Sequence, residues 1–403
     1  MLAHTNLLHM ENLPRTIDLV SHEDKKGARA KGHTSDETCA KHTRAEVVAI
    51  DQTLLPTRLS MLHMHTLNEV CDAIARLAVR GAPALGVAAA CALALWAINE
   101  SADKDTDGFL RSLGEQAVKI GSVRPTAVNL AWGAKRALES ARQEADKLAE
   151  RSRAHATGDA GTAAGSTDAD SSCQDGMAAL KQTIFACAKD MIREDEAANR
   201  AIGANGAALL KPGSNVLTIC NAGSLATAYY GTALGVIYSA YEQGRVNHVY
   251  SLETRPVMQG ARLTMWELMR AGIPCTLISD GMTATVMSQG RVDAVLVGAD
   301  RIAKNGDTAN KIGTLQVAIL ASYYNIPFYV CAPTSTIDAG IENGNGIAIE
   351  ERDRTELAGI ATPDGAWVQT SPDAADIYNP AFDVTPSELI TKYITEQGCI
   401  MLQ

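Results

Sequence analysis

Residues 211–224 have the sequence KPGSNVLTICNAGS, and this stretch decides the fold. Its opening Lys-Pro-Gly (211–213) ends a helical pattern, because proline cannot continue a helix and glycine favours the position just after one. A short apolar run follows at 215–219, which is typical of a buried strand bounded by turn residues. The sequence therefore predicts a domain boundary near residue 210 and a strand that ends at Cys220.

Strand-like and helix-like runs alternate from this boundary to the C-terminus. The expected strands lie at residues 215–219, 248–252, 275–279, 293–298 and 327–331. Helix-like runs at 224–241, 257–272, 282–289 and 310–325 separate them. This alternation is typical of a parallel sheet covered by helices, so residues 211–403 are predicted to form a Rossmann-like α/β catalytic domain. Neither GxGxxG after a strand nor GxxxxGK[ST] occurs, so dinucleotide and Walker-type phosphate binding have no support.

The chain before residue 210 has a helical character. Apolar residues recur three and four positions apart over most of residues 60–207, so residues 45–210 are predicted to form a smaller, mainly helical N-terminal domain. Residues 1–44 lack this periodicity and mix 7 basic with 6 acidic residues, which predicts a loosely ordered extension. Residues 151–176 consist largely of Ala, Gly, Ser, Thr and Asp, which predicts a flexible insertion.

Composition excludes several classes of protein. The 403 residues carry 36 Lys and Arg against 46 Asp and Glu, a formal charge of −10. With this charge and only 4 Trp, 4 Phe and 10 Tyr, no nucleic-acid partner is expected. The nine cysteines never occur as CxxC, which favours a reducing compartment, the cytoplasm, over a disulfide framework or zinc ribbon. The membrane-like run at 81–99 is dominated by alanine, so we expect a buried helix and no membrane partner.

Two ionisable residues follow predicted strands and are expected at the same edge of the sheet, where ligands of open parallel sheets collect. Cys220 follows the first strand, and a helix N-terminus behind it is expected to lower the pKa of its thiol and to bind phosphate. Asp300 follows the fourth strand, where a partly apolar crevice would raise its pKa and suit a general acid and base. Asp293, at the other end of that strand, is expected to face away. The alternatives are a small buried Cys220, and a helix cap or an ion pair with Arg301 for Asp300.

Cationic and amide groups elsewhere indicate an anionic ligand. The tetrapeptide RGAP at 80–83 places proline near the first turn of a helix, so Arg80 and the free N–H groups behind it form a candidate phosphate cradle. Arg124-Pro125 begins another long helix in the same way, and Asn310 with Lys311 adds an amide and an ammonium. The alternative for RGAP is ordinary helix initiation beside a solvated arginine.

The histidines exclude two kinds of site. Beyond residue 65 the only histidines are His155 and His248, so neither a histidine metal site nor a Ser-His-Asp triad is expected. The acid and base must therefore come from Asp, Glu, Cys or Lys. A thiol and a carboxyl facing a phosphate pocket suit proton transfer on a small sugar phosphate.

At these residues the chain resembles the methylthioribose-1-phosphate isomerase family, within the wider group that includes the regulatory subunits of translation initiation factor 2B. The matching motifs are RGAPALG (80–86), RPTAVNLAW (124–132), CNAGSLAT (220–227), ETRPVMQGARLTMWEL (253–268), VGADRIAKNGDTANKIGT (297–314) and YNPAFDVTP (378–386). The resemblance implies conversion of S-methyl-5-thio-D-ribose 1-phosphate to the ribulose 1-phosphate in methionine salvage, without metal, nucleotide or other cofactor.

The resemblance also implies a role for each matching residue. Asp300 would be the proton donor, and Cys220 would stabilise the transition state or shuttle a proton. The implied substrate-binding residues are Arg80, Gly81, Ala82, Arg124, Gln259, Asn310 and Lys311. The family fold is a Rossmann-like domain preceded by a smaller helical domain, usually as a homodimer. Two alternatives stay open: a ribose-1,5-bisphosphate isomerase and a non-catalytic regulatory subunit of the initiation-factor type.

Overall fold

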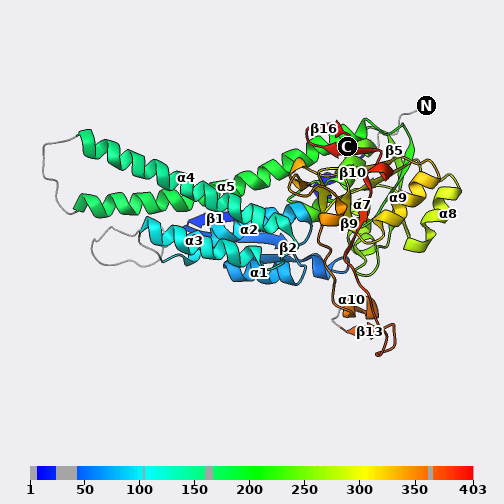
Figure 1. The fold of residues 1–403 in the computed structure, drawn as a ribbon, viewed down its shortest axis with the longest axis horizontal. Coiled ribbons are helices and arrows are strands. Elements are labelled where there is room, and N and C mark those ends of the chain that lie inside the picture. The colour runs from blue at the N-terminus through cyan, green and yellow to red at the C-terminus, as the bar shows by residue number, and fades with distance from the viewer. Residues whose placement is uncertain (1–6, 24–42, 103–104, 159–166, 362–365, 403) are drawn as a thin grey trace, which may run out of the picture.

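The computed structural model describes residues 7–23, 43–102, 105–158, 167–361 and 366–402. The protein is a mixed α/β structure in which long helices extend from one side of a body built on a sheet (Figure 1). Helices dominate the described part of the chain before Ala207, and the larger sheet forms after Ser214. The predicted α/β class is therefore confirmed, and the division into separate domains stays a prediction.

A seven-stranded sheet forms the centre of the second half. Its order is β16-β15-β10-β7-β4-β5-β6, and every neighbouring pair is parallel except β15 with β16. The strands are β4 (Ser214–Thr218), β5 (Val246–Leu252), β6 (Cys275–Ile278), β7 (Ala294–Val297), β10 (Phe328–Cys331), β15 (Lys392–Thr395) and β16 (Gly398–Ile400). The central strands β7 and β10 are buried along their whole length, as expected of parallel strands covered on both faces. All five predicted strands are present, whereas β15 and β16 were not expected.

Four α-helices accompany these strands, and the first is shorter than predicted. They are α6 (Ala233–Glu242), α7 (Met265–Arg270, which continues a π-helical turn at Gly260–Thr264), α8 (Thr283–Ser288) and α9 (Thr314–Tyr323). The helix expected at 224–241 begins only at Ala233, after a single 3-10 turn at Ser224–Ala226. Tyr230 and Gly231 have φ of 80° and 86°, which a right-handed helix cannot contain, so helix forms only beyond them.

A second, four-stranded sheet of order β11-β8-β9-β14 stands directly after β7. Its strands are β8 (Arg301–Ala303), β9 (Thr308–Lys311), β11 (Ile337–Asp338) and β14 (Phe382–Thr385). The antiparallel hairpin β8–β9 brings the chain back to the residues just after β7, where the Asp300 N–H donates to the Ala309 carbonyl at 2.9 Å. The helix expected from residue 310 is therefore wrong at its start, because Asn310 and Lys311 belong to β9.

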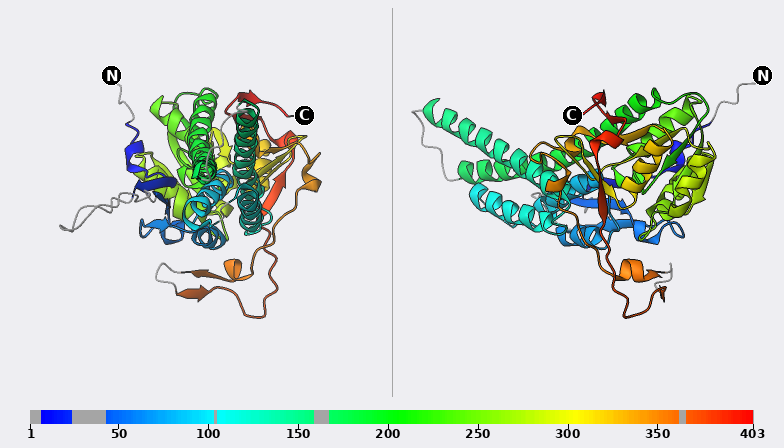
Figure 2. Two further views of the ribbon diagram at one scale, coloured as in Figure 1. Left: turned by 90° about the vertical axis from the view of Figure 1, so that its left-hand side faces the viewer. Right: turned by 45° about the vertical axis from the view of Figure 1, so that its right-hand side comes forward.

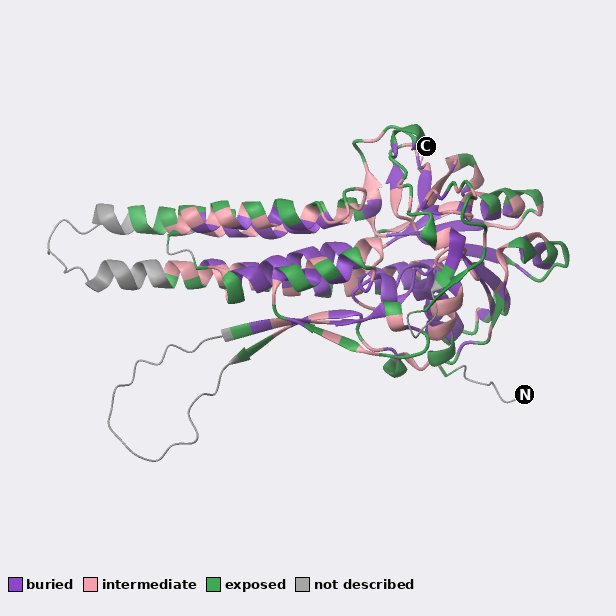
Figure 3. Cartoon of the chain, turned by 90° about the horizontal axis from the view of Figure 1, so that it is seen from below, coloured by how far each residue is buried: buried purple, intermediate pink, exposed green. Residues whose placement is uncertain are grey.

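The first half of the chain is built around one apolar helix. The helices are α1 (Leu67–Ala75), α2 (Ala82–Leu95, continued by a π-helical turn at Trp96–Glu100), α3 (Thr106–Gly121), α4 (Val128–Gly158) and α5 (Thr167–Ala207). Among the described residues, Ala82–Glu100 is long and apolar enough to cross a membrane. It lies instead among α1, α3, α4 and α5, and its residues from Ala84 to Ala97 are buried (Figure 3). The prediction of a buried helix is confirmed.

Part of the expected N-terminal extension is ordered, and that prediction is wrong for residues 7–23. A three-stranded antiparallel sheet consists of β1 (Ile17–Glu23), β2 (Thr43–Ile50) and β3 (Met61–Met64). Ile17 and Leu19 are at most 1% exposed, because α2 and α5 pack on this sheet. Pairing with β2 and burial of two aliphatic side chains offset the ordering entropy of a segment that is polar by composition. Residues 1–6 and 24–42 of the expected extension lie outside the described residues.

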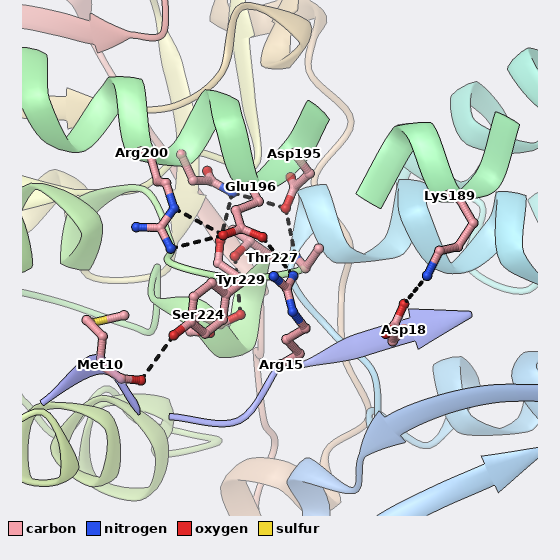
Figure 4. Close-up of polar contacts among 12 residues, drawn as sticks. Met10, Arg15, Asp18, Lys189, Asp195, Glu196, Arg200, Ser224, Thr227 and Tyr229 are labelled. Atoms are coloured by element: carbon pink, nitrogen blue, oxygen red, sulfur yellow. Dashed lines mark hydrogen bonds and ion pairs between the residues drawn. The ribbon is translucent and has the colours of Figure 1, made fainter. Parts of the chain in front are cut away.

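The segment before β1, residues 7–16, forms an N-terminal strap that joins the helices to the sheet. Arg15 makes an ion pair with Glu196 of α5 at 2.7 Å (Figure 4). The buried Thr16 hydroxyl donates to the Ser224 carbonyl, just after β4, at 2.6 Å. The strap therefore holds both α5 and the segment that follows Cys220.

The flexible insertion expected at 151–176 is also corrected. Helix α4 continues to Gly158 and α5 begins at Thr167, so the described parts of this segment are helical (Figure 1). Alanine, the strongest helix former, is frequent here, and two adjacent helices support each other. Residues 159–166 lie outside the described residues.

A C-terminal arm projects from the body beside the cavity described below (Figure 2). It consists of α10 (Thr355–Ala358) and the antiparallel pair β12 (Gly359–Ala361) and β13 (Trp367–Gln369). Ile360 and Trp367 are 42% and 46% exposed, so the arm carries apolar side chains in contact with solvent.

Candidate active site

A cavity of about 900 Å³ lies at the carboxyl ends of β4, β7 and β10. The start of α2, the hairpin β8–β9 and the C-terminal arm form its other walls. All nine predicted site residues line it, namely Arg80, Gly81, Ala82, Arg124, Cys220, Gln259, Asp300, Asn310 and Lys311. The structure thus brings together residues from distant parts of the chain, as the sequence predicted, and their roles stay predictions.

Cys220 stands at the end of β4 in a strained backbone conformation with φ of 65°. Its N–H donates to the Thr254 hydroxyl at 2.8 Å, and its carbonyl accepts from Thr264 at 2.6 Å. Burial raises the pKa of the Cys220 thiol, although Arg80 and Lys311 lower it. The prediction of a lowered thiol pKa is therefore wrong.

Burial is the largest cause of the raised pKa, and the turn behind Cys220 offers no free N–H groups to oppose it. The N–H groups of Ser224 and Leu225, which were expected to face a phosphate, donate to the buried carboxylate of Glu267 at 2.6 and 3.2 Å. They consequently face a protein anion, and the expected phosphate site behind Cys220 is wrong as well. Sequence reasoning missed Glu267, whose only signal was its place in the motif at 253–268.

Asp300 lies beyond the end of β7, next to β4 in the sheet, so it emerges beside Cys220. Burial raises its pKa, although Lys311, Arg80 and Arg124 lower it. The raised pKa agrees with the sequence prediction. The alternative pairing with Arg301 is wrong, because that guanidinium faces Asp338 at 3.9 Å.

Asp293 immediately precedes β7, at the opposite end of the strand from Asp300. Its carboxylate accepts from the Asn215 N–H at 2.8 Å, outside the cavity lining. The prediction that Asp293 faces away from the site is confirmed.

Lys311 and Asn310 reach the cavity from β9. The Lys311 ammonium donates to the Ala381 carbonyl at 2.7 Å and lies 4.7 Å from the centre of the Phe382 ring. Burial lowers the pKa of Lys311, whereas Cys220 and Asp300 raise it. Asn310 donates to the Thr314 hydroxyl at 3.1 Å.

Arg80 and Gly81 enter the cavity at the first turn of α2. The Arg80 guanidinium donates through Nη1 to the Asn221 side-chain oxygen at 2.9 Å and through Nη2 to the Asn221 carbonyl at 2.8 Å. Gly81 is the N-cap of α2 with φ of 94°, and an added Cβ would lie 2.4 Å from the Ala226 carbonyl oxygen. Glycine is therefore required where α2 begins against the segment that follows Cys220.

Four buried polar atoms of cavity-lining residues have no partner within the described part of the protein. They are Nε of Arg124, Oε1 of Gln259, Oε1 of Gln52 and Oε2 of Glu356. Because buried polar groups normally form hydrogen bonds, such atoms suit a polar ligand. Arg124 itself precedes α4 by four positions and therefore lies in the preceding turn, not in the first helical turn as expected.

The outer wall of the cavity, nearest the C-terminal arm, contains Arg352 and Glu356, and Glu350 contacts this wall from outside the lining. Sequence reasoning missed all three residues. Glu350 accepts from Arg352 at 2.7 Å, from Thr126 at 2.8 Å and from Arg124 at 3.4 Å. Arg352 also pairs with Glu356 at 2.5 Å. The alternating charges of residues 350–356 (EERDRTE) were the only signal in the sequence.

The described residues contain no group of three or more His, Cys, Asp or Glu side chains placed to hold a metal ion. The predicted site residues in this lining offer a thiol, a carboxyl, three cationic side chains and two side-chain amides. The lining also includes Arg76, Arg255, Arg262, Arg352, Cys331 and Glu356.

Comparison with known sequences adds independent information. A profile described as the initiation factor 2 subunit family matches residues 78–401. The chain is 48% identical over 355 residues to the 5-deoxyribose 1-phosphate isomerase of Moorella thermoacetica, covering 88% of this chain and 92% of that protein. It is 46% identical over 354 residues to the methylthioribose-1-phosphate isomerase of Geobacillus kaustophilus, covering 88% and 90%.

Comparison with solved structures gives the same group of proteins. The fold is similar to 5-methylthioribose 1-phosphate isomerase from Pyrococcus horikoshii, with a TM-score of 0.76, 37% identity and coverage of 97% of this chain and 94% of that one. A structure described as the delta subunit of translation initiation factor eIF-2B from A. fulgidus has a TM-score of 0.71 and 42% identity, covering 88% and 93%.

Proposed function

The chain belongs to the initiation factor 2 subunit family, and from this membership and the geometry of its cavity we propose that it is an aldose–ketose isomerase. It converts S-methyl-5-thio-D-ribose 1-phosphate to S-methyl-5-thio-D-ribulose 1-phosphate in methionine salvage. The observation that carries this proposal is the position of Cys220 and Asp300, which follow neighbouring strands and line one cavity with three cationic side chains.

Asp300 is the proton donor in the proposed reaction. The anomeric phosphate prevents simple opening of the sugar to a free aldehyde, so the ring oxygen must receive a proton as its bond to C1 breaks. Burial, which raises the pKa of Asp300, favours the protonated carboxyl that this step needs. When the C2 hydroxyl becomes the ketone, its proton returns to Asp300, so the carboxyl ends the cycle as it began.

The hydrogen on C2 must then reach C1, and Cys220 acts in either of two routes. In a proton relay the thiolate removes it and returns it to C1 through an enediolate. In a hydride shift it passes directly, and Cys220 stabilises the transition state. Turnover in D₂O separates these routes, because a relay through an exchangeable thiol places solvent deuterium on C1 and a shift retains the original hydrogen.

The cationic side of the cavity suits the phosphate. Arg80 and Arg124 come from two different segments, and the N-terminus of α2 at Gly81 and Ala82 adds partial positive charge. Lys311 and Asn310 lie nearer Asp300, and the unpartnered Gln259 oxygen is free to accept from a sugar hydroxyl.

Other contacts favour a substrate with one phosphate over ribose 1,5-bisphosphate. Four further arginines line the cavity and already donate to protein oxygens: Arg76 to Asp51, Arg255 to the Pro256 carbonyl, Arg262 to the Gln52 carbonyl and Arg352 to Glu350. A second phosphate would have to share these guanidinium groups with their protein partners. Apolar lining residues such as Leu55 and Leu263 suit a methylthio group instead.

A second candidate substrate, 5-deoxyribose 1-phosphate, follows from the 48% identity to the Moorella thermoacetica protein. Its C5 is a methyl group, whereas C5 of the proposed substrate carries a methylthio group, so it would fill less of the apolar part of the cavity. The reacting atoms at C1 and C2 are the same.

NMR-monitored turnover by purified protein tests the proposal, with methylthioribose 1-phosphate, 5-deoxyribose 1-phosphate and ribose 1,5-bisphosphate as parallel substrates. We expect the highest kcat/KM for the methylthio sugar, unchanged by EDTA and without added nucleotide. Preference for the bisphosphate would contradict the assignment, and silence on all three from folded protein would favour a regulatory subunit. We further expect a homodimer in solution and a cytoplasmic location.

A further inference from the structure

A buried carboxylate lies behind the cavity and contacts no predicted site residue directly. Glu267 of α7 is 0% exposed. Its Oε1 accepts from the Asn221 side chain at 2.7 Å and from the Leu225 N–H, and its Oε2 accepts from the Ser224 N–H and from the Tyr238 hydroxyl at 2.9 Å. Four donors for one carboxylate compensate for its burial without a cationic partner among them.

This carboxylate determines which way the Asn221 amide faces. The Asn221 nitrogen donates to Glu267, so the amide oxygen must face the opposite side, where Nη1 of Arg80 donates to it at 2.9 Å. A reversed amide would place two N–H donors against the guanidinium and an oxygen against the carboxylate. The charge of Glu267 therefore selects the amide orientation that holds Arg80.

Glu267 also supports the backbone segment that forms a second contact with Arg80. Nη2 of Arg80 donates to the Asn221 carbonyl at 2.8 Å, within the segment whose next N–H groups Glu267 binds. Gly223 approaches so closely that an added Cβ would lie 2.4 Å from Oε2 of Glu267. A small displacement of the carboxylate would therefore move the segment and Arg80 together.

We propose that Glu267 is a positioning residue that sets the Arg80 guanidinium in the cavity through Asn221. It touches neither the substrate nor the reacting groups, and it acts on both through Arg80. The kinetic consequence rests on the proposed isomerase function, whereas the effect on Cys220 does not.

The effect on Cys220 follows from the charges around the thiol. Arg80, which precedes α2, and Lys311 of β9 favour the thiolate, whereas Asp300, which follows β7, disfavours it. If Arg80 leaves its place, the thiol loses one of its two favourable charges. The midpoint of thiol ionisation should then rise.

Glu267→Gln tests the proposal, with Tyr238→Phe as its matched control. Glutamine keeps the shape, but whichever end carries its NH₂ group turns a donor toward a donor. We expect KM to rise by roughly 10-fold or more with a smaller change in kcat, because a charge-assisted contact to Arg80 is lost. Tyr238→Phe removes one donor to the same carboxylate and leaves Asn221 in place, so KM should stay within about twofold.

Alkylation of Cys220 by iodoacetamide, followed by mass spectrometry of its peptide across pH, gives a readout that needs no turnover. We expect its midpoint to rise in Glu267→Gln and to stay unchanged in Tyr238→Phe. Folded Glu267→Gln with wild-type KM and an unchanged midpoint would overturn the proposal. If wild-type protein turns over no sugar phosphate, the proposed function fails while the alkylation midpoint still tests Glu267.

Asn221→Ala keeps the proposal testable if Glu267→Gln does not fold. It removes the side-chain link to Arg80 and leaves both the Asn221 carbonyl contact and the bonds from Glu267 to Ser224 and Leu225. We expect KM and the alkylation midpoint to rise, by no more than in Glu267→Gln. Where both variants fold, the double variant should show no further rise beyond Glu267→Gln alone, because Asn221 acts downstream of Glu267, whereas fully additive effects would overturn that order.

Discussion

The two walls of the cavity handle charge in opposite ways. The inner wall is formed by Cys220, Asp300 and Lys311. Burial raises the pKa of Cys220 and Asp300 and lowers that of Lys311, so in each case it favours the uncharged form. Beside the outer wall, burial also disfavours the charge of Glu350, but hydrogen bonds from Arg352 and Thr126 outweigh this effect and lower the pKa of Glu350. Burial thus disfavours the charged form of the groups proposed to exchange protons, whereas neighbouring opposite charges favour the ionised form of Glu350.

The largest expected effect comes from the inner wall. Asp300→Asn should lower kcat by at least about 10³-fold, because the amide keeps the shape but cannot donate a proton and recover it. Steady-state kinetics of the isomerisation measures the loss. Asp293→Asn, at the other end of the strand region, is the matched control and should keep wild-type kcat. Near-wild-type turnover by folded Asp300→Asn would remove the carboxyl from the mechanism.

The pH profile sharpens the same assignment. A proton donor must be protonated in the free enzyme, so kcat/KM should fall as pH rises through the pKa of Asp300, which burial raises. Because the shift is upward, the fall should come at higher pH than for an ordinary aspartate. A profile that instead rises over this range would identify Asp300 as a base.

Cys220→Ser should have the second-largest effect, a loss of about 10²-fold in kcat, since a hydroxyl ionises far less readily than a thiol. Bound sugar phosphate should also slow alkylation of Cys220. Cys275→Ser provides the control, because Cys275 opens β6 and lies outside the cavity lining. A dispensable thiol that substrate leaves unprotected would return Cys220 to the role of a small buried residue.

The outer wall should affect binding more than turnover. Glu350→Gln removes a negative charge beside Arg124, so we expect KM to fall by about 3-fold with little change in kcat. Glu342→Gln is the control, because Glu342 pairs with Lys304 at 3.0 Å in an exposed position. A rise in KM would mean that Glu350 serves to anchor Arg124, and a large loss of kcat would break the distinction between the walls.

The smallest effect is expected far from either wall. Deleting residues 152–175, near the ends of α4 and α5, should leave kcat and KM within about twofold, because this part of the helices lies outside the cavity lining. The same kinetic assay applies, with thermal unfolding to confirm that the shortened protein folds. A folded but inactive protein would show that the long helices contribute to the site.

Much of this site could be predicted because parallel strands end at a common edge. Once the runs at 215–219 and 293–298 are recognised as strands, Cys220 and Asp300 must approach each other if those strands are neighbours. The residues on α2 and β9 were found through motifs, whose spacing is local and therefore visible in the sequence.

The parts that were not predicted depend on contacts between distant residues. The pKa of Cys220 is raised because tertiary packing buries the thiol, which the local sequence does not show. The expected phosphate site assumed that the N–H groups of Ser224 and Leu225 were free, yet Glu267 binds them from more than 40 positions away. The hairpin β8–β9 was hidden because Asn310 and Lys311 adjoin the pattern of α9. Local propensity could not reveal either feature.

The contact between Thr16 and the Ser224 carbonyl has a consequence for the order of folding. The two residues are 208 positions apart, so the strap leaves the ribosome long before its partner is made. At about 5–20 residues per second this interval is on the order of 10–40 s. During that time the strap cannot make this contact, because Ser224 has not yet been synthesised. The segment behind Cys220 can complete its contacts only if the strap has stayed free of other partners until then.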